Sequence, residues 1–344
     1  MTKPNNAYCL VMKFSKFLFV FFLMSKLSYS QEILPVYSDY LSDNYYLLHP
    51  SMAGASSCTK IRLTARQQWF GQDKAPALQT FSINGMAGER SGLGLILMND
   101  VNGYHSQKGA KVSYAHHLRF SRDDSDLNQL SFGMNVGFSQ SMLDETDFLT
   151  NNPAYDPIIN GTMTQKASYF NMDIGTTYNY LDFYAHFTIK NLLASDRKLY
   201  TDYEPVNLRR FVFNMGYTFG DKERLLIEPS MLFQHIAQTK ESIVDANIKL
   251  YKPLGDNAKI WGGLSYRTSL DGAQYVEGNS AKDQKMQYVT PLLGINYKSL
   301  MLSYTYSHLL GNVKFDNGGF HQITLGFNLF CSPDKYDCNC PANN

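Results

Sequence analysis

Two arrangements of side chains in this sequence could support chemistry. His116 and His117 are adjacent and could ligate a metal, and Asp173 and His186 are types that act as acid and base. Neighbouring residues of a strand point to opposite faces, so the two adjacent histidines cannot bind one ion from the same wall. A catalytic dyad also needs a nucleophile and an orienting partner, and the sequence identifies neither. Because G-x-S-x-G, H-E-x-x-H and phosphate-loop motifs are absent as well, we expect a non-enzymatic protein without cofactor or metal.

The composition of the chain narrows its class. Its 344 residues suit two ordinary domains or one large β structure. The 31 Lys and Arg residues balance 30 Asp and Glu residues, so the charge gives no indication of a nucleic-acid partner. Aromatic residues make up 14% of a chain whose mean hydropathy is −0.29, which favours amphipathic strands over membrane helices.

The N-terminal end of the chain differs from the remainder. A basic start and the apolar run FLFVFFLM, too short to span a bilayer, precede Ser28 and Ser30 at positions −3 and −1 of a cleavage site. These are the parts of a secretory signal peptide, with translation starting at Met1 or Met12. We therefore predict that residues 1–30 are removed and that the mature protein leaves the cytoplasm.

Alternation of apolar and polar residues dominates the rest of the chain. In LSFGMNVGFSQ, every second residue from Leu130 to Phe138 is apolar, and the residues between them are small or polar. Most of the predicted strands have ten or more residues, whereas soluble strands average about five or six and a tilted membrane strand needs about 9–11. The pattern predicts fourteen strands, near 60–70, 76–86, 91–99, 108–120, 127–141, 167–181, 182–192, 208–219, 223–238, 243–252, 258–269, 285–297, 299–310 and 320–331.

The predicted connections alternate in length. Odd-numbered links are mostly longer, around 99–107, 142–166, 193–207 and 270–284, and even-numbered links are short, such as AGER and GDKE. Long external loops, short periplasmic turns and an even strand number are typical of outer-membrane barrels. Backbone groups in a bilayer must be paired, so such a sheet has to close. We predict an all-β, transmembrane antiparallel β-barrel of about fourteen strands over residues 60–331, with both termini periplasmic.

The polar face of these strands would line the lumen. Arg62, Thr64 and Arg66 share one face of the first strand. A fourteen-strand barrel encloses a lumen too wide for side chains alone to fill. Further charges on this face are interpreted as neutralising one another: Glu228, Asp245, Lys249 and Arg267. Tyrosines near strand ends would form interfacial girdles: Tyr178, Tyr180, Tyr304 and Tyr306.

Four cysteines remain after removal of the signal peptide: Cys58, Cys331, Cys338 and Cys340. In an oxidising compartment four cysteines allow three pairings. Cys58 precedes the first predicted strand and Cys331 ends the last, and these strands are neighbours in a closed barrel. A structural disulfide could therefore join Cys58 to Cys331, or Cys58 to the Cys338-Asn-Cys340 pair. A zinc site is less consistent with this spacing.

The segment before the first strand, residues 31–59, is expected on the periplasmic side. Its Tyr and Leu spacing near 40–48 predicts a short helix ended by Pro50. This piece could plug the barrel mouth, offer a surface to a partner, or cap the rim. The Cys-containing tail, residues 332–344, is expected on the same side.

Four segments near the N-terminus carry recognisable motifs: LLHPSMAG, RLTARQQWFG, APALQTFSING and GLGLILMNDVNG. They resemble the PorP/SprF family of type IX secretion system membrane proteins, in which an Asn-Pro-Ala-x-x-Gly box precedes R-x-x-W-x-G, a proline-containing strand and a glycine-rich strand. His49 and Ser51 depart from the usual Asn and Ala. The resemblance is most specific over about residues 33–100 and continues as a strand pattern to Phe330. The matching residues are Pro50, Gly54, Arg66, Trp69, Gly71, Pro76, Gly92 and Gly94.

The resemblance implies a multi-pass outer-membrane barrel that serves type IX secretion or gliding motility. Its partners would be outer-membrane lipid and either one secreted, adhesin-like surface protein, whose export or retention it assists, or the periplasmic ring of the machinery. Trp69 would then anchor the first extracellular turn at the membrane interface. Two alternatives stay open: a diffusion channel or small-molecule transporter with a polar lumen, and an outer-membrane hydrolase that depends on Asp173 or His186.

Overall fold

The computed structural model describes residues 38–68, 75–121, 126–146, 164–194, 209–255, 257–277, 280–310 and 319–332. The predicted signal peptide lies outside the described residues, and so does most of the predicted Cys-containing tail. The same holds for Trp69, Gly71, Cys338 and Cys340. The domain boundaries expected at residues 30 and 59 therefore stay predictions.

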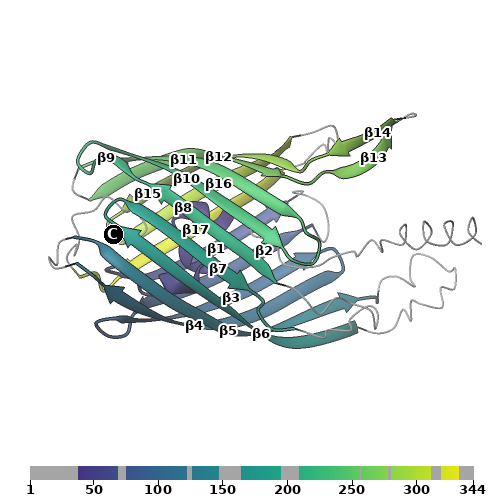
Figure 1. Cartoon of the computed structure of the whole chain (residues 1–344), viewed down its shortest axis with the longest axis horizontal. Helices are drawn as coiled ribbons and strands as arrows, with labels where there is room; N and C mark the ends of the chain where they lie inside the picture. The colour runs from purple at the N-terminus through teal and green to yellow at the C-terminus, as the bar shows by residue number, and fades with distance from the viewer. Residues whose placement is uncertain are drawn as a thin grey trace, which may run out of the picture. The chain divides into compact units, whose positions relative to one another are not determined.

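The described residues form short 3₁₀ helices followed by strands (Figure 1). The helices are η1 (Ser38–Ser42), η2 (Tyr45–Leu47) and η3 (Pro50–Met52). The strands are β1 (Thr59–Gln68), β2 (Ala77–Met86), β3 (Ser91–Asn102), β4 (His105–Arg119), β5 (Asn128–Asp144), β6 (Thr164–Tyr180), β7 (Phe183–Lys190), β8 (Arg210–Tyr217), β9 (Phe219–Asp221), β10 (Leu225–Ile236), β11 (Ser242–Pro253), β12 (Ala258–Ser269), β13 (Ala273–Glu277), β14 (Ser280–Gln284), β15 (Gln287–Tyr297), β16 (Leu300–Leu310) and β17 (Gly319–Leu329).

Fourteen of these strands pair antiparallel in a closed ring: β1 to β8, β10 to β12 and β15 to β17. The first and last strands meet along the whole of β1, from Thr59 opposite Leu329 to Gln68 opposite Phe320. The short β9 pairs with the start of β10, and β13 with β14 forms a separate ribbon between β12 and β15. Closure satisfies the backbone hydrogen bonds of every strand in the ring, as a membrane-spanning sheet requires. The predicted fourteen-strand barrel is confirmed.

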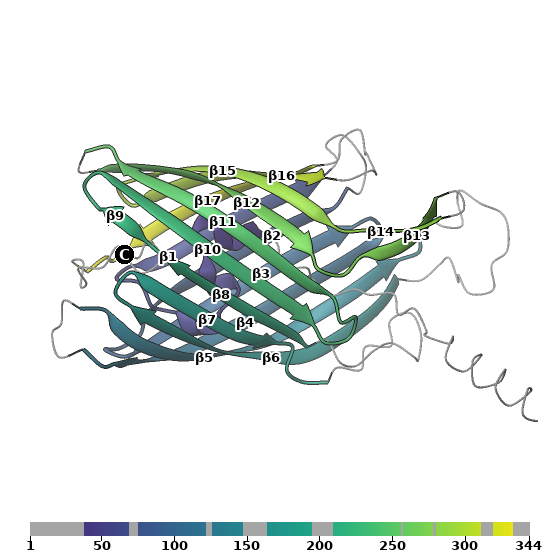
Figure 2. The ribbon, with the colours of Figure 1, turned by 45° about the horizontal axis from the view of Figure 1, so that its top comes forward.

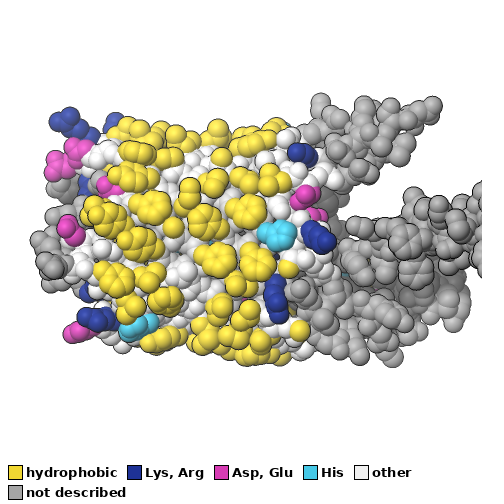
Figure 3. Space-filling view, viewed as in Figure 1, with side chains coloured by type: hydrophobic (Ala, Val, Ile, Leu, Met, Phe, Trp, Pro, Cys, Tyr) yellow, Lys and Arg dark blue, Asp and Glu magenta, His cyan; other side chains and the backbone are white. Residues whose placement is uncertain are grey.

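The two faces of the wall differ as the alternation predicts. On β5, Phe132, Met134 and Phe138 expose 50%, 40% and 53% of their surface on the outside, whereas Ser131 and Asn135 are buried on the inside. Figure 3 shows the result on one face of the barrel, where apolar side chains cover much of the surface and charged residues gather toward the ends. An apolar outer face is the face that lipid contacts. Among the described residues, no helix has the length and hydropathy needed to cross a membrane.

The connection between β3 and β4 is shorter than the sequence suggested. A loop was expected around residues 99–107, but the two strands continue to Asn102 and restart at His105, and only Gly103 and Tyr104 turn the chain. Gly103 has a φ of +63°, a value that glycine adopts without steric cost and that two-residue hairpin turns require. The polar residues in this stretch belong to strand ends, which the composition alone did not distinguish from a loop.

Candidate functional site: a plug inside the barrel

The segment from Tyr40 to Gly54, here named the plug, lies inside the barrel (Figures 1 and 2). Its large side chains are buried, with exposures of 0% for Tyr40, 2% for Tyr45 and 3% for Tyr46. A ring of this strand number is too wide for wall side chains to fill alone, and the plug occupies the space.

The local structure of the plug differs from the predicted helix. Residues 40–48 do not form one helix that Pro50 ends; η1 and η2 are separate 3₁₀ turns, and Pro50 begins η3. The correction has a physical reason. Proline suits the first position of a helix, where no N–H is needed, and it forces the preceding residue, His49, into an extended conformation.

Charged groups anchor the first half of the plug to β10 and β11. Lys249 on β11 donates to Asp43 with an Nζ–Oδ1 distance of 2.6 Å, and it lies 3.2 Å from Glu228 Oε1 on β10. The Lys249 and Glu228 side chains expose 0% and 1%, so this network is shielded from water. Glu228 also accepts a hydrogen bond of 3.0 Å from Tyr45 of the plug. Burial would raise the pKa of Asp43, but the Lys249 ammonium beside it holds that pKa below its usual value.

A second ion pair contacts the hydroxyl of Tyr40. Arg267 on β12 donates to both carboxylate oxygens of Asp245 on β11, at 2.7 and 2.6 Å, and the Tyr40 hydroxyl donates to the same carboxylate at 2.7 Å. The expectation that lumen charges neutralise one another is thus confirmed for Lys249 with Glu228 and for Arg267 with Asp245. The contribution of Asp43 was missed, because nothing in the local sequence marks an aspartate as a partner for a lysine 206 residues away.

Hydroxyls and amides anchor the plug to the wall from β2 to β7. On β2, Asn84 Oδ1 accepts from the backbone N–H of Gly54 at 3.1 Å, and Ser82 accepts from Asn44 at 3.1 Å. The remaining contacts pair plug residues with β4, β6 and β7: Tyr46 with Ser113 at 2.6 Å, Ser51 with Thr177 at 2.7 Å, His49 Nδ1 with Thr188 at 2.9 Å, and Ala53 O accepting from His117 Nε2 at 3.0 Å.

His49 sits in an unusual environment for a histidine. Its ring packs against His186 on β7, with centroids 4.9 Å apart, and Lys190 on the same strand donates to the nearby carbonyl of Leu47. Burial, together with His186 and Lys190, holds the pKa of His49 well below its usual value. The lowered pKa favours the neutral form of the His49 ring.

Glycines of the wall make room for the plug backbone. A Cβ on Gly92 or Gly133 would collide with plug backbone atoms of Ala53–Gly54 and Pro50–Ser51, and a Cβ on Gly175 would come within 3.2 Å of Pro50 Cδ. Gly54 itself has a φ of +68°, and a Cβ there would lie 2.8 Å from the backbone of β2 and β3. A side chain on Gly94 would collide with the Tyr46 hydroxyl. The motif residues Pro50, Gly54, Gly92 and Gly94 therefore meet at the plug–wall contact.

Gly133 and Gly175 share this role but were not singled out from the sequence. They lie opposite each other in the β5–β6 register. Glycine in the interior of a strand often marks a close backbone approach, and this signal could have identified them.

Asp173 and His186 do not form a catalytic pair. His186 lies opposite Thr177 and contacts its hydroxyl at 2.9 Å, whereas Asp173 accepts from Lys111 at 2.7 Å. His116 and His117 point to opposite faces, as expected: only His117 is buried at the plug. Among the described residues, no group of three or more His, Cys, Asp or Glu side chains could hold a metal ion.

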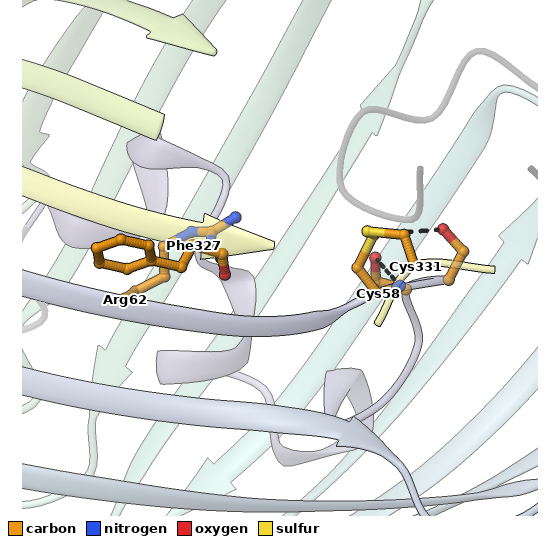
Figure 4. Close-up of a disulfide and its surroundings, with 6 residues drawn as sticks. Cys58, Arg62, Phe327 and Cys331 are labelled. Atoms are coloured by element: carbon orange, nitrogen blue, oxygen red, sulfur yellow. Dashed lines mark hydrogen bonds between the residues drawn. A yellow bond between two sulfur atoms is a disulfide. The ribbon is translucent and has the colours of Figure 1, made fainter. Parts of the chain in front are cut away.

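A disulfide joins the chain just after the plug to the seam of the barrel, where β1 pairs with β17. Cys58, just before β1, forms a disulfide with Cys331, just after β17, across 273 residues of sequence (Figure 4). The pairing of the two strands continues past their ends, where Ser332 N–H donates to Ser57 O at 3.1 Å. Of the pairings that the sequence allowed, the structure contains Cys58 with Cys331.

Two other motif residues belong to the β1–β2 hairpin. Arg66 faces the lumen, and its guanidinium lies over the Phe320 ring of β17, 3.9 Å from the centroid. The carbonyl of Pro76 accepts from the N–H of Gln68 at 2.9 Å and so begins the β1–β2 pairing. Both stabilise the barrel wall near its seam.

A closed antiparallel ring with an apolar exterior and a polar, filled interior is the fold of an outer-membrane β-barrel. The family model "Type IX secretion system membrane protein PorP/SprF" matches residues 29–327, and the chain belongs to this family. Family and fold are those of a secretion-system membrane barrel.

Solved structures with a similar arrangement are distant. The CymD monoaromatic hydrocarbon channel gives a TM-score of 0.45 at 10% identity, covering 83% of this chain and 91% of that chain. A TodX deltaS2S3 mutant monoaromatic hydrocarbon channel gives 0.45 at 11% identity, covering 78% and 88%. A FadL homologue from Pseudomonas aeruginosa gives 0.43 at 9% identity, covering 79% and 89%. Scores of this size support no functional inference, and no curated protein matches the chain.

Proposed function

We propose that this barrel assists the export or surface retention of one partner protein of the type IX secretion machinery. The observation that carries the proposal is the family match over residues 29–327, which includes the plug and almost the whole barrel. The partner is a secreted, adhesin-like surface protein, and gliding motility is the process in which such a protein would act. A contact with the periplasmic ring of the machinery is the second form of the same role.

The orientation and processing of the chain belong to this proposal. The signal peptide directs the protein across the inner membrane, and both ends of the mature chain lie in the periplasm. The plug then enters the lumen from the periplasmic side, because it is connected directly to β1 at Cys58. In this orientation the plug would be accessible to a periplasmic partner during assembly.

The filled lumen weighs against the alternative of a diffusion channel. An open pore needs a continuous aqueous path, and buried side chains of the plug occupy the lumen here. A hydrolase is not supported either, because Asp173 and His186 have separate structural partners.

Deletion of the gene, followed by quantitative proteomics of the cell surface and the culture fluid, tests the proposal. Loss of one large protein from the surface would identify a dedicated partner. Loss of many secreted proteins together would place the barrel with the core machinery. Unchanged secretion would refute the secretion role, and re-expression of the wild-type gene should reverse any loss.

A further inference from the structure

We propose that the plug stays in place while the protein works, so that no exported protein passes through this lumen. The exported partner then binds outside the lumen. The statement about the partner rests on the proposed function, whereas the statement about the plug rests on the structure alone. The barrel would act as a sealed membrane anchor for its partner. Three features of the plug carry this inference: its covalent end, its path across the lumen and its fit to the wall.

The covalent end limits how far the plug can travel. Gly54 precedes the disulfide-bonded Cys58 by four residues. A chain of that length spans at most about 14 Å when fully extended. The last residues of the plug therefore stay within about 14 Å of Cys58, whatever happens to the rest of the segment.

The path of the plug distributes its contacts over opposite walls. Its first half binds β10 and β11, and its last residues bind β2, β3 and β4. In the ring, six strands separate β3 from β11 in either direction, so these walls are diametrically opposed. A plug that rests on one wall could swing aside as a lid. A plug anchored on both walls has to lose both sets of contacts before a path opens.

The fit to the wall removes the space that a sliding movement would need. Pro50 and Ser51 lie against Gly133 and Gly175, and Gly54 lies against the backbones of β2 and β3. The strands cannot move apart to release the plug, since each is paired on both sides in the closed ring. An interior packed this closely does not deform gradually, so a gate would need a second packed arrangement of the same residues.

A designed disulfide between plug and wall tests the inference. The hydroxyl oxygens of Ser51 on the plug and Thr177 on β6 are 2.7 Å apart and both side chains are buried, so Ser51→Cys with Thr177→Cys places two thiols within bonding reach. Mass spectrometry of the joined peptides verifies the crosslink, and each single substitution is the matched control.

We expect the crosslinked protein to support the same surface level of the partner as the wild type. Loss of the partner that a membrane-permeant reductant restores, with no effect of the reductant on wild-type cells, would show that the plug must move and would overturn the inference. The gene deletion runs in parallel. If it leaves secretion unchanged, the proposed function fails, and a second measurement decides the plug inference by itself.

That second measurement is the conductance of the purified wild-type protein in planar bilayers. We expect no channel activity, with a variant lacking residues 38–54 as the conducting reference. Steady conductance by the wild type would overturn the inference even if the crosslinked variant failed to reach the outer membrane.

Discussion

Replacement of Lys249 by methionine should loosen the first half of the plug. The lysine side chain is fully buried, and its ammonium group lies 2.6 Å from Asp43 and 3.2 Å from Glu228. Removing one partner of a buried ion pair leaves an uncompensated charge and costs about 3–5 kcal/mol. Glu228 keeps a hydrogen bond from Tyr184, and the Tyr251 hydroxyl lies within hydrogen-bond distance of both Glu228 and Asp43, so we expect a cost of about 3 kcal/mol.

This cost should appear as a change in the opening equilibrium of the plug. About 3 kcal/mol corresponds to roughly a hundredfold larger population of the detached state. Hydrogen–deuterium exchange of peptides from residues 40–48 in the purified protein measures that population. Peptides from β1 report whether the barrel itself has unfolded.

Two further variants make the result specific. Lys252→Met removes an exposed lysine from the same strand and should leave exchange unchanged. Asp43→Asn combined with Lys249→Met removes the carboxylate that lost its lysine partner. This double variant should recover part of the protection of the plug from hydrogen exchange. The reasoning would be refuted if Lys249→Met left exchange of the plug at the wild-type rate, or if the double variant exchanged faster than the single one.

Three other predictions follow from the same contacts. Gly92→Ala should destabilise the protein by about 1–3 kcal/mol in a heat-modifiability assay, because the added Cβ collides with the plug backbone. Gly88→Ala is the control and should be neutral, because the space around Gly88 is open. Equal effects of the two substitutions would contradict this prediction. Cys58→Ser should lower the stability of the protein by about 2–5 kcal/mol in the same assay. Adding Cys331→Ser should lower it little further, because the disulfide is already absent. A further large loss of stability in the double variant would contradict the disulfide. The pKa of His49 is lowered in the folded state, so the His49 ring takes up a proton more readily when the plug is detached. Protection of the plug from hydrogen exchange should therefore be full above a pH of about 6.5 and fall as the pH drops below it. His49→Gln should flatten that dependence.

The strand framework was predictable because it depends on a period that the sequence displays directly. The side chains from Leu130 to Phe138 alternate with the pleat, so their faces are fixed once the strand is recognised. Closure of the ring then brings Cys58 beside Cys331 without further information. These conclusions use only local pattern and topology.

The interior of the barrel was not predictable in the same way. The plug has no repeating period, and its conformation depends on wall residues far away in sequence, as the contact of Asp43 with Lys249 illustrates. The short 3₁₀ turns are stabilised by these tertiary contacts, because local hydrogen bonds contribute little in such short pieces. Pattern reasoning therefore placed the segment before β1 but left its position in the lumen open.

Four of the family-motif residues lie where the plug contacts the wall of the barrel. Gly54 on the plug meets Gly92 on β3, and Gly94 on the same strand faces Tyr46. Pro50 lies against Gly133 and Gly175, so this part of the motif describes how a plug fits a wall. It contains no group directed at a ligand or at an external surface. A chain can keep this interior fit while its outer surfaces change, since the closed ring separates the two. These four motif residues therefore specify how the plug fills the lumen, and under the proposed function the choice of partner would depend on residues outside the lumen.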